Sequence, residues 1–218
     1  MTAHELMVEV NHRLIRGEEL KREEKTSIVR RLLQEQSTPE QAWRFYRGVN
    51  YPGNTDSSGR QMYPVFYIPP YNGGNKLKTV LDALLKTHIL SANMYELEIL
   101  RLLFLFAPDN PEIKHMIDKT LERLKTACFA ARDDGVGECF DASLIVLRFL
   151  AAVSQDRGWM QSRIDNFHAH YKDKRRAKHV LWYFWLCLSE LPLKLAAPEI
   201  VWYKREMIPW LSADPVIG

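Results

Sequence analysis

Two segments of this chain, residues 97–125 and 144–172, match each other, and this internal repeat constrains the fold more than any other feature. Each segment has a leucine-rich stretch, an aspartate near its middle and a second stretch with apolar residues at helical spacing. The identical pairs are Leu97/Leu144, Leu100/Leu147, Arg101/Arg148, Leu103/Leu150, Asp109/Asp156, Ile117/Ile164, Asp118/Asp165 and Lys125/Lys172. Each segment therefore predicts a helix, a short turn and a second helix.

The repeat also indicates how such hairpins must assemble. A single helical hairpin cannot bury its apolar face alone, so neighbouring hairpins must stack. The period, from Leu97 to Leu144, lies in the range of ~40–47 residues found in two-helix repeats. In this period and in its hairpin form the chain resembles HEAT-type arrays, which implies an array of antiparallel helical hairpins. The resemblance rests on two copies, and an α/α-toroid, as in some glycan-active enzymes, uses similar hairpins.

Apolar periodicity elsewhere predicts a single all-α domain over residues 1–218. N-terminal helices are predicted within residues 1–48, where Gly17 divides them. The helical-hairpin array is predicted over residues 76–218. Within the array, helices are expected over residues 76–92, 95–106, 111–132, 138–154, 159–171, 177–191 and 198–211, with Pro111 and Pro198 in first turns. Residues 177–191 are apolar on nearly all sides, which predicts a central buried helix.

Residues 49–75 form a long loop in this interpretation, because they contain several prolines and glycines that break helices. The loop is rich in aromatic residues, and such segments beside a rigid scaffold are typical of recognition surfaces. The binding residues predicted on this ground are Tyr63, Phe66, Tyr67, Tyr71 and Lys76. The alternative is that the loop covers an apolar end of the helical array.

Composition places the chain among ordinary globular proteins. Of its 218 residues, 46% are apolar and 26% charged, and the net charge of +3 is too small to indicate nucleic-acid binding by itself. The three cysteines lack the C-x-x-C spacing of metal or redox motifs. The charged N-terminus does not resemble a signal peptide, and the longest apolar run is far shorter than the ~20 residues of a membrane helix. We expect a cytoplasmic protein without a membrane partner.

One segment offers weak candidates for catalysis. Glu138 and Asp141 are three residues apart at the start of a predicted helix, so their carboxylates are neighbours, and Cys139 lies between them. A cysteine at a helix start can have a lowered pKa. However, acidic residues in a first turn also compensate the helix dipole, and they disfavour a thiolate. A structural role explains this segment without any reaction.

Two Glu-x-x-His spacings, Glu9/His12 and Glu112/His115, resemble half of a di-iron ligand set on helices. In both cases the apolar face of the predicted helix directs the pair away from the core. We therefore expect neither a metal site nor a cofactor.

Basic residues concentrate in one run, Lys174, Arg175, Arg176 and Lys178, close to tryptophans. Such a combination can contact phosphates and bases, although most basic runs between helices are solvated connections. Nucleic-acid binding through this run is one alternative function.

Arg101 and Arg148 occupy equivalent positions in leucine-rich helices. A buried arginine is costly without a partner, so we expect each to form an ion pair, with Asp118 and Asp165 as the partners.

Three functions remain. The leading hypothesis is a binding module that recognises a protein or peptide through a groove and the tyrosine-rich loop. The alternatives are an enzyme that acts on a small or sugar-like ligand with the carboxylate pair, and a nucleic-acid-binding repeat protein. The sequence leaves open whether the protein catalyses a reaction, which partner it has and whether it oligomerises.

Overall fold

A computed structural model describes residues 1–38, 62, 64–66, 78–81, 88–131, 138–171 and 178–206. Apart from turns and short connections, these residues are helical, with an isolated antiparallel bridge between Gln36 and Phe66. The prediction of an all-α fold is confirmed for this part of the chain. None of the described helices is both long and apolar enough to cross a membrane.

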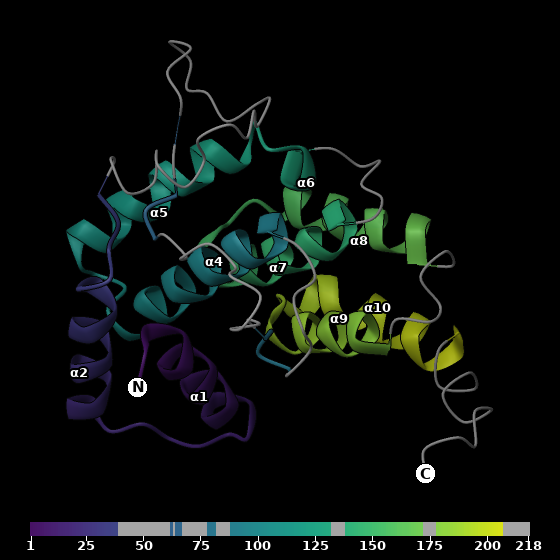
Figure 1. Ribbon diagram of the computed structural model, residues 1–218. Helices are drawn as coiled ribbons and strands as arrows, with labels where there is room; N and C mark the ends of the chain where they lie inside the picture. Colours follow the sequence, from purple (N-terminus) through teal and green to yellow (C-terminus); the bar gives the residue numbers. More distant parts are fainter. Residues whose placement is uncertain are drawn as a thin grey trace.

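Short connections join α1 to α2, α4 to α5, α5 to α6, α7 to α8 and α9 to α10 (Figure 1). Their bounds are α1 Ala3–Ile15, α2 Arg22–Leu33, α4 His88–Phe106, α5 Pro111–Leu124, α6 Cys128–Ala131, α7 Glu138–Val153, α8 Arg157–Tyr171, α9 Lys178–Glu190 and α10 Leu193–Glu206. The predicted long loop, residues 49–75, lies almost entirely outside the described residues.

Local sequence signals explain several helix ends. Thr2 and Glu5 form a reciprocal capping box at the start of α1. Gly17, with φ of +74°, separates α1 from α2, as predicted, because this left-handed conformation is cheap only for glycine. Asn110 caps α5, and Pro111 occupies its first turn, as predicted for this proline.

Several predicted helix boundaries are wrong. The break expected at residues 93–94 lies inside α4, and the helix expected over residues 111–132 is divided into α5 and α6. Residues 78–81 were expected in a helix but are not helical. The carbonyls of Lys78 and Val80 accept hydrogen bonds from the rings of His4 and His12, at 3.2 and 2.8 Å, so they are engaged with α1.

The sequence predicts that the last helix begins at residue 198, but α10 begins at Leu193 and contains Pro198 in its second turn. The helix starts earlier because the carbonyl of Pro192 accepts from the backbone N–H groups of Leu195 and Ala196, at 2.8 and 3.0 Å. Pro198 lies beyond the first turn, so its missing N–H removes one hydrogen bond inside α10, which is costly.

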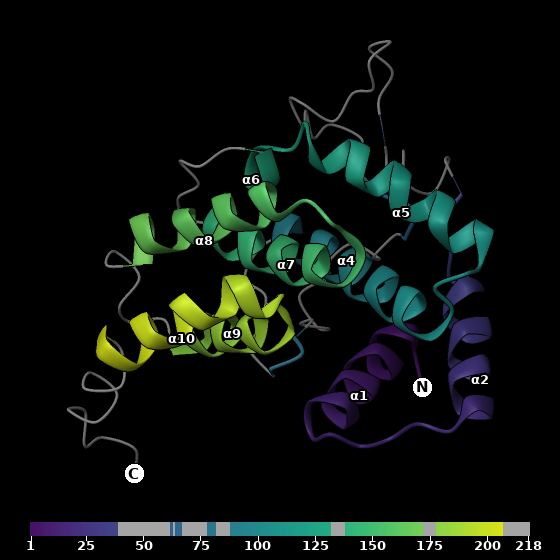
Figure 2. The ribbon, with the colours of Figure 1, turned by 180° about the vertical axis from the view of Figure 1, so that it is seen from behind.

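The helices pack around a central pair, α4 and α7. Helices α1, α2 and α5 contact α4, whereas α6, α8 and α9 contact α7, and α10 packs on α9 (Figures 1 and 2). The core is formed mainly by the leucine-rich faces of α4 and α7. The prediction that residues 177–191 form the central buried helix is wrong, because α9 lies in an outer layer and exposes Trp182 and Trp185.

The two repeated segments each contain two helices joined by a turn, α4–α5 and α7–α8. Their first helices end at the equivalent residues Phe106 and Val153. Their turns differ, because Asn110 caps α5 whereas Asp156 accepts from the backbone N–H of Trp159 at the start of α8. That these hairpins belong to a HEAT-like array stays a prediction.

Candidate functional site

A groove with a volume of about 1010 Å³ lies between α1, α4 and α9. In both ribbon views α1 and α9 flank the short 78–81 segment (Figures 1 and 2). The groove is lined by His12, Leu14, Ile15, Arg16, Val80, Leu81, Arg101, Leu105, Trp182, Trp185, Leu186, Ser189 and Glu190. This volume is at the upper end of the ~300–1,000 Å³ typical of ligand pockets.

The walls of the groove carry exposed apolar side chains from three different helices. Ile15 of α1 is 42% exposed, Leu105 of α4 is 44%, and Trp182 and Trp185 of α9 are 51% and 40%. Single exposed apolar residues are common on protein surfaces, but several around one hollow indicate an interaction site. These four side chains therefore mark the groove as a candidate for recognition.

The position of the tryptophans follows from helical geometry. Trp182, Trp185 and Ser189 are spaced at i, i+3 and i+7, so they share one face of α9. The opposite face buries Tyr183 and Phe184 against the core. The ring of Tyr203 on α10 contacts the ring of Trp185, with 4.4 Å between their centroids.

The floor of the groove contains an ion pair between Arg101 and Glu190. Arg101 Nε and Nη2 donate to Glu190 Oε2 and Oε1, at 3.1 and 2.5 Å. Arg148 donates to the same carboxylate, from Nε at 3.1 Å and from Nη2 at 2.9 Å. Each oxygen of Glu190 thus accepts two hydrogen bonds, and the carboxylate joins the groove to the core.

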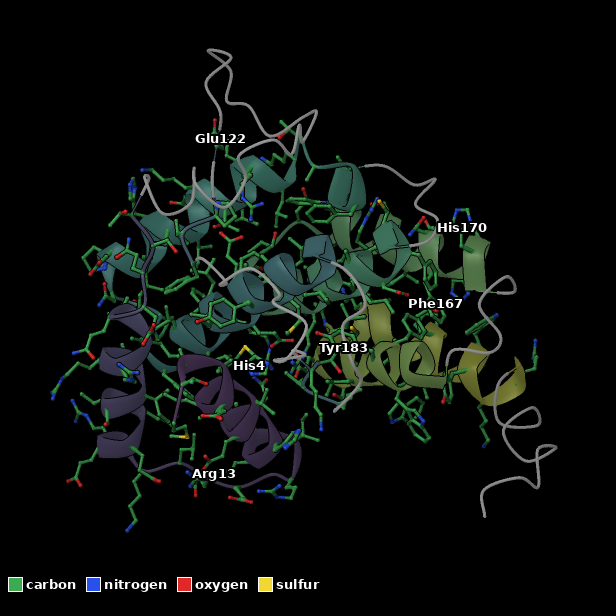
Figure 3. All side chains as sticks on the ribbon, viewed as in Figure 1. His4, Arg13, Glu122, Phe167, His170 and Tyr183 are labelled. Atoms are coloured by element: carbon green, nitrogen blue, oxygen red, sulfur yellow. The ribbon has the colours of Figure 1, made fainter. Side chains whose placement is uncertain are left out.

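A buried polar network continues beneath this floor. Arg148 Nη1 donates to both oxygens of Glu98, at 2.6 and 2.7 Å, and the hydroxyl of Tyr183 donates to Glu98 Oε1 at 2.6 Å. Asn11 Oδ1 accepts from Arg101 and from Arg148, at 3.2 and 3.0 Å. The network links α1, α4, α7 and α9, and Figure 3 shows Tyr183 toward the middle of the molecule.

The charges of this network perturb its titratable groups. Burial favours the neutral form of Glu98, but the charges of Arg148 and Arg101 and the Tyr183 hydrogen bond outweigh it and lower the pKa of this carboxyl. Burial together with the Glu98 charge raises the pKa of Tyr183 well above its ordinary value. Burial likewise raises the pKa of the Cys187 thiol. Two arginines, Arg101 and Arg148, face two carboxylates, Glu98 and Glu190, so the formal charges of the network balance.

A second buried ion pair holds the 64–66 segment on the helices. Arg123 of α5 donates to Glu96 of α4, and the backbone N–H of Val65 donates to Glu96 Oε1 at 2.9 Å. Phe66 is only 1% exposed and belongs to the core. For Phe66 the structure supports the alternative that this part of the loop covers the helices. The other predicted binding residues, Tyr63, Tyr67, Tyr71 and Lys76, lie outside the described residues.

The predicted partners of the two repeat arginines are wrong. Asp118 and Asp165 are exposed on α5 and α8, and Asp165 accepts from Gln161. Arg101 and Arg148 do form ion pairs, as their burial requires, but with carboxylates of α4 and α9.

The candidate catalytic residues lie away from the groove. Cys139 and Asp141 occupy the start of α7, are partly buried and do not line it. The side chain of Glu138 is outside the described part, so the carboxylate pair stays a prediction. The same holds for nucleic-acid binding, because Lys174, Arg175 and Arg176, and the side chain of Lys178, are not described.

The Glu-x-x-His pairs are separated from each other in the fold. Glu9 and His12 line a smaller cavity beside the groove, whereas Glu112 and His115 are exposed on α5. His12 Nε2 donates to the carbonyl of Val80. Among the described residues, groups of three or more His, Cys, Asp or Glu side chains that could hold a metal ion are absent.

Neither the groove nor the buried polar network beneath it was predicted from the sequence. A usable signal was present in α4, where Glu96, Glu98 and Arg101 interrupt an otherwise apolar helix. A second signal was the i, i+3 spacing of Trp182 and Trp185. Comparisons with models of protein families, with curated proteins and with solved structures found no match for this chain.

Proposed function

We propose that the protein is a binding module that holds an apolar segment of a partner protein in the groove between α1, α4 and α9. The observation that carries this proposal is the convergence of Ile15, Leu105, Trp182 and Trp185 on one hollow. A partner that covers large exposed apolar side chains removes their surface from water, which lowers the free energy of the complex. Tryptophan is also among the residues that contribute most to protein–protein binding.

The floor of the groove supports the same proposal. Arg101 is held by Glu190 and Asn11, and Glu190 is held in turn by Arg148. A binding surface whose side chains are already fixed loses little conformational entropy when a partner docks. The polar network therefore provides a rigid base, and the exposed apolar walls provide the contact area.

Peptide display on the immobilised full chain tests this function. The library contains peptides of ~15 residues, a length at which an isolated peptide can begin to form a helix. The selected binders should be rich in bulky apolar residues. Their affinity should fall at least tenfold, about 1.4 kcal/mol, for Leu105→Asp and for Trp182→Ala. Leu193→Asp is the matched control, because Leu193 is an exposed leucine of α10 that does not line the groove.

Two results would contradict the proposal. One is a selection that yields no reproducible binder. The other is a set of binders that the groove variants retain as well as the Leu193→Asp control does. Thermal unfolding of each variant shows whether a loss of binding reflects a loss of folding.

A further inference from the structure

We propose that the exposed face of α10 is a docking surface for an anionic lipid bilayer, on which this helix lies parallel to the membrane plane. The surface is separate from the groove and goes beyond the proposed function, because none of its residues lines the groove. Two features carry the inference, an apolar stripe that the protein does not bury and basic side chains beside it. The sequence-based expectation of no membrane partner is revised here, because it rested on the lack of a segment that could span a bilayer.

The exposed face of α10 is apolar at helical spacing. It consists of Leu193, Ala197, Ile200 and Val201. These positions are i, i+4, i+7 and i+8, which share one face of a helix. Leu193 is 77% exposed and Val201 is 61% exposed. A different face of α10 already packs in the core through Ala196 and Tyr203. The helix therefore has a second apolar stripe, which faces solvent.

The charged side chains beside this stripe are basic. Lys204 lies one turn after Ile200, and Arg205 lies one turn after Val201. Lys194 belongs to the first turn of the helix, and all three basic residues are exposed. Within the described part of the chain, none of the three has an ion-pair partner. Their long aliphatic stems can lie along an apolar surface while their cationic groups reach the polar headgroups.

The described carboxylates of α9 and α10 do not offset this positive charge. Glu199 is only 8% exposed, and its Oε2 lies 2.5 Å from Nε2 of His168 on α8. Glu190 accepts hydrogen bonds from the two arginines of the buried network. The side chain of Glu206, the last residue of α10, is outside the described part. The described exposed face of α10 is therefore positive, and a complementary surface is negative.

Composition favours a bilayer over a protein as the partner. Protein–protein interfaces are depleted of lysine, whereas helices that lie in a membrane interface combine aliphatic residues with lysine and arginine. A symmetric dimer would bring the same patch of two copies together, so Lys194 and Lys204 would meet like charges. Helix α10 lies in an outer layer and packs on α9, which leaves its other side free to contact a flat surface (Figures 1 and 2).

Co-sedimentation of the full chain with lipid vesicles tests the inference. One set of vesicles contains phosphatidylcholine alone, and in the other roughly a third of the lipid is phosphatidylserine, which gives a negative surface. The protein should bind the phosphatidylserine vesicles at least tenfold more tightly at low salt. Higher salt should weaken this binding, because it screens the exposed charges.

Two substitutions on α10 remove the two features separately. Leu193→Asp introduces a carboxylate into the apolar stripe, and Lys204→Glu reverses a charge beside it. Each should weaken binding to the phosphatidylserine vesicles at least tenfold. Lys119→Glu is the matched charge control, because Lys119 is an exposed lysine of α5, away from α10 in both ribbon views. Leu105→Asp is the matched apolar control, because Leu105 is an exposed leucine of the groove. Both controls should keep vesicle binding.

Several results would overturn the inference. They are a lack of binding to phosphatidylserine vesicles at low salt, equal binding to both vesicle types, and binding that both α10 variants retain. A dimer in sedimentation that Leu193→Asp dissociates would assign the face to a second copy and would also overturn it. Thermal unfolding of each variant shows whether a loss of binding reflects a loss of folding. The proposed function is tested separately, because Leu105→Asp should weaken peptide binding and keep vesicle binding, whereas Leu193→Asp should do the reverse.

Discussion

Arg148, which is completely buried, donates two hydrogen bonds to Glu190, a carboxylate on the floor of the groove, at 3.1 and 2.9 Å. Glu190 binds Arg101 in the same way, so one carboxylate holds two arginines from different helices. The groove and the core therefore share this carboxylate. A change at Glu190 should affect both the stability of the fold and the shape of the groove.

We expect Glu190→Gln to destabilise the protein by ~3–5 kcal/mol, because it leaves two buried guanidinium groups with a single full carboxylate partner, Glu98. Urea unfolding of the variant and the parent measures this loss. Glu18→Gln is the control, because Glu18 forms exposed ion pairs with Arg13 and Arg16, and solvent screening makes such pairs contribute little to stability. A similar small loss in both variants would show that the network contributes little.

The lowered pKa of Glu98 predicts a specific dependence of stability on pH. A carboxyl whose pKa is lower in the folded state stabilises the fold above its unfolded pKa of about 4.3, and this contribution disappears as pH falls through the folded pKa. Glu98→Gln lacks this titration. The difference in unfolding free energy between parent and variant should therefore be largest near about pH 7 and should narrow below about pH 4. A difference that stays constant over this range would contradict the prediction.

Local signals in the sequence were sufficient for many helix boundaries. Gly17 and Pro111 act through their own backbone conformation, so their effects can be predicted without knowledge of the fold. The same reasoning showed that Arg101 and Arg148 need partners. It did not identify them, because Glu190 lies 89 residues from Arg101 and only the packing of α9 brings them together.

Helix α9 illustrates a different limit. Its apolar residues surround the helix, and this pattern predicts burial on all sides. In the structure Trp182 and Trp185 are exposed beside a groove instead. A side chain that packs in a core and one that binds a partner have the same apolar character, so hydrophobicity alone does not distinguish them. The groove itself requires α1, α4 and α9 together, and no local pattern predicts that arrangement.

Phe66 should contribute to stability and not to recognition. It is buried, and its segment is held by the hydrogen bond from Val65 to Glu96. We expect Phe66→Ala to cost ~3–5 kcal/mol, as is typical of a buried aromatic residue. Phe104→Ala makes the same change at a partly buried position and should cost less. Thermal or urea unfolding measures both losses, and a loss below ~1 kcal/mol for Phe66→Ala would restore the loop as a recognition surface at this residue.

Two aromatic residues of α9 should respond in opposite ways to truncation. Phe184 is buried, and its ring stacks on Phe167 with 3.7 Å between centroids, so Phe184→Ala should cost ~3–5 kcal/mol of unfolding free energy. Trp182 is about half exposed beside the groove, and Trp182→Ala should cost less than ~1 kcal/mol. The same Trp182→Ala variant should lose peptide binding, because its indole packs against the occupant. If Trp182→Ala destabilised the fold as much as Phe184→Ala, the indole would belong to the core, and the groove would lose its principal apolar wall.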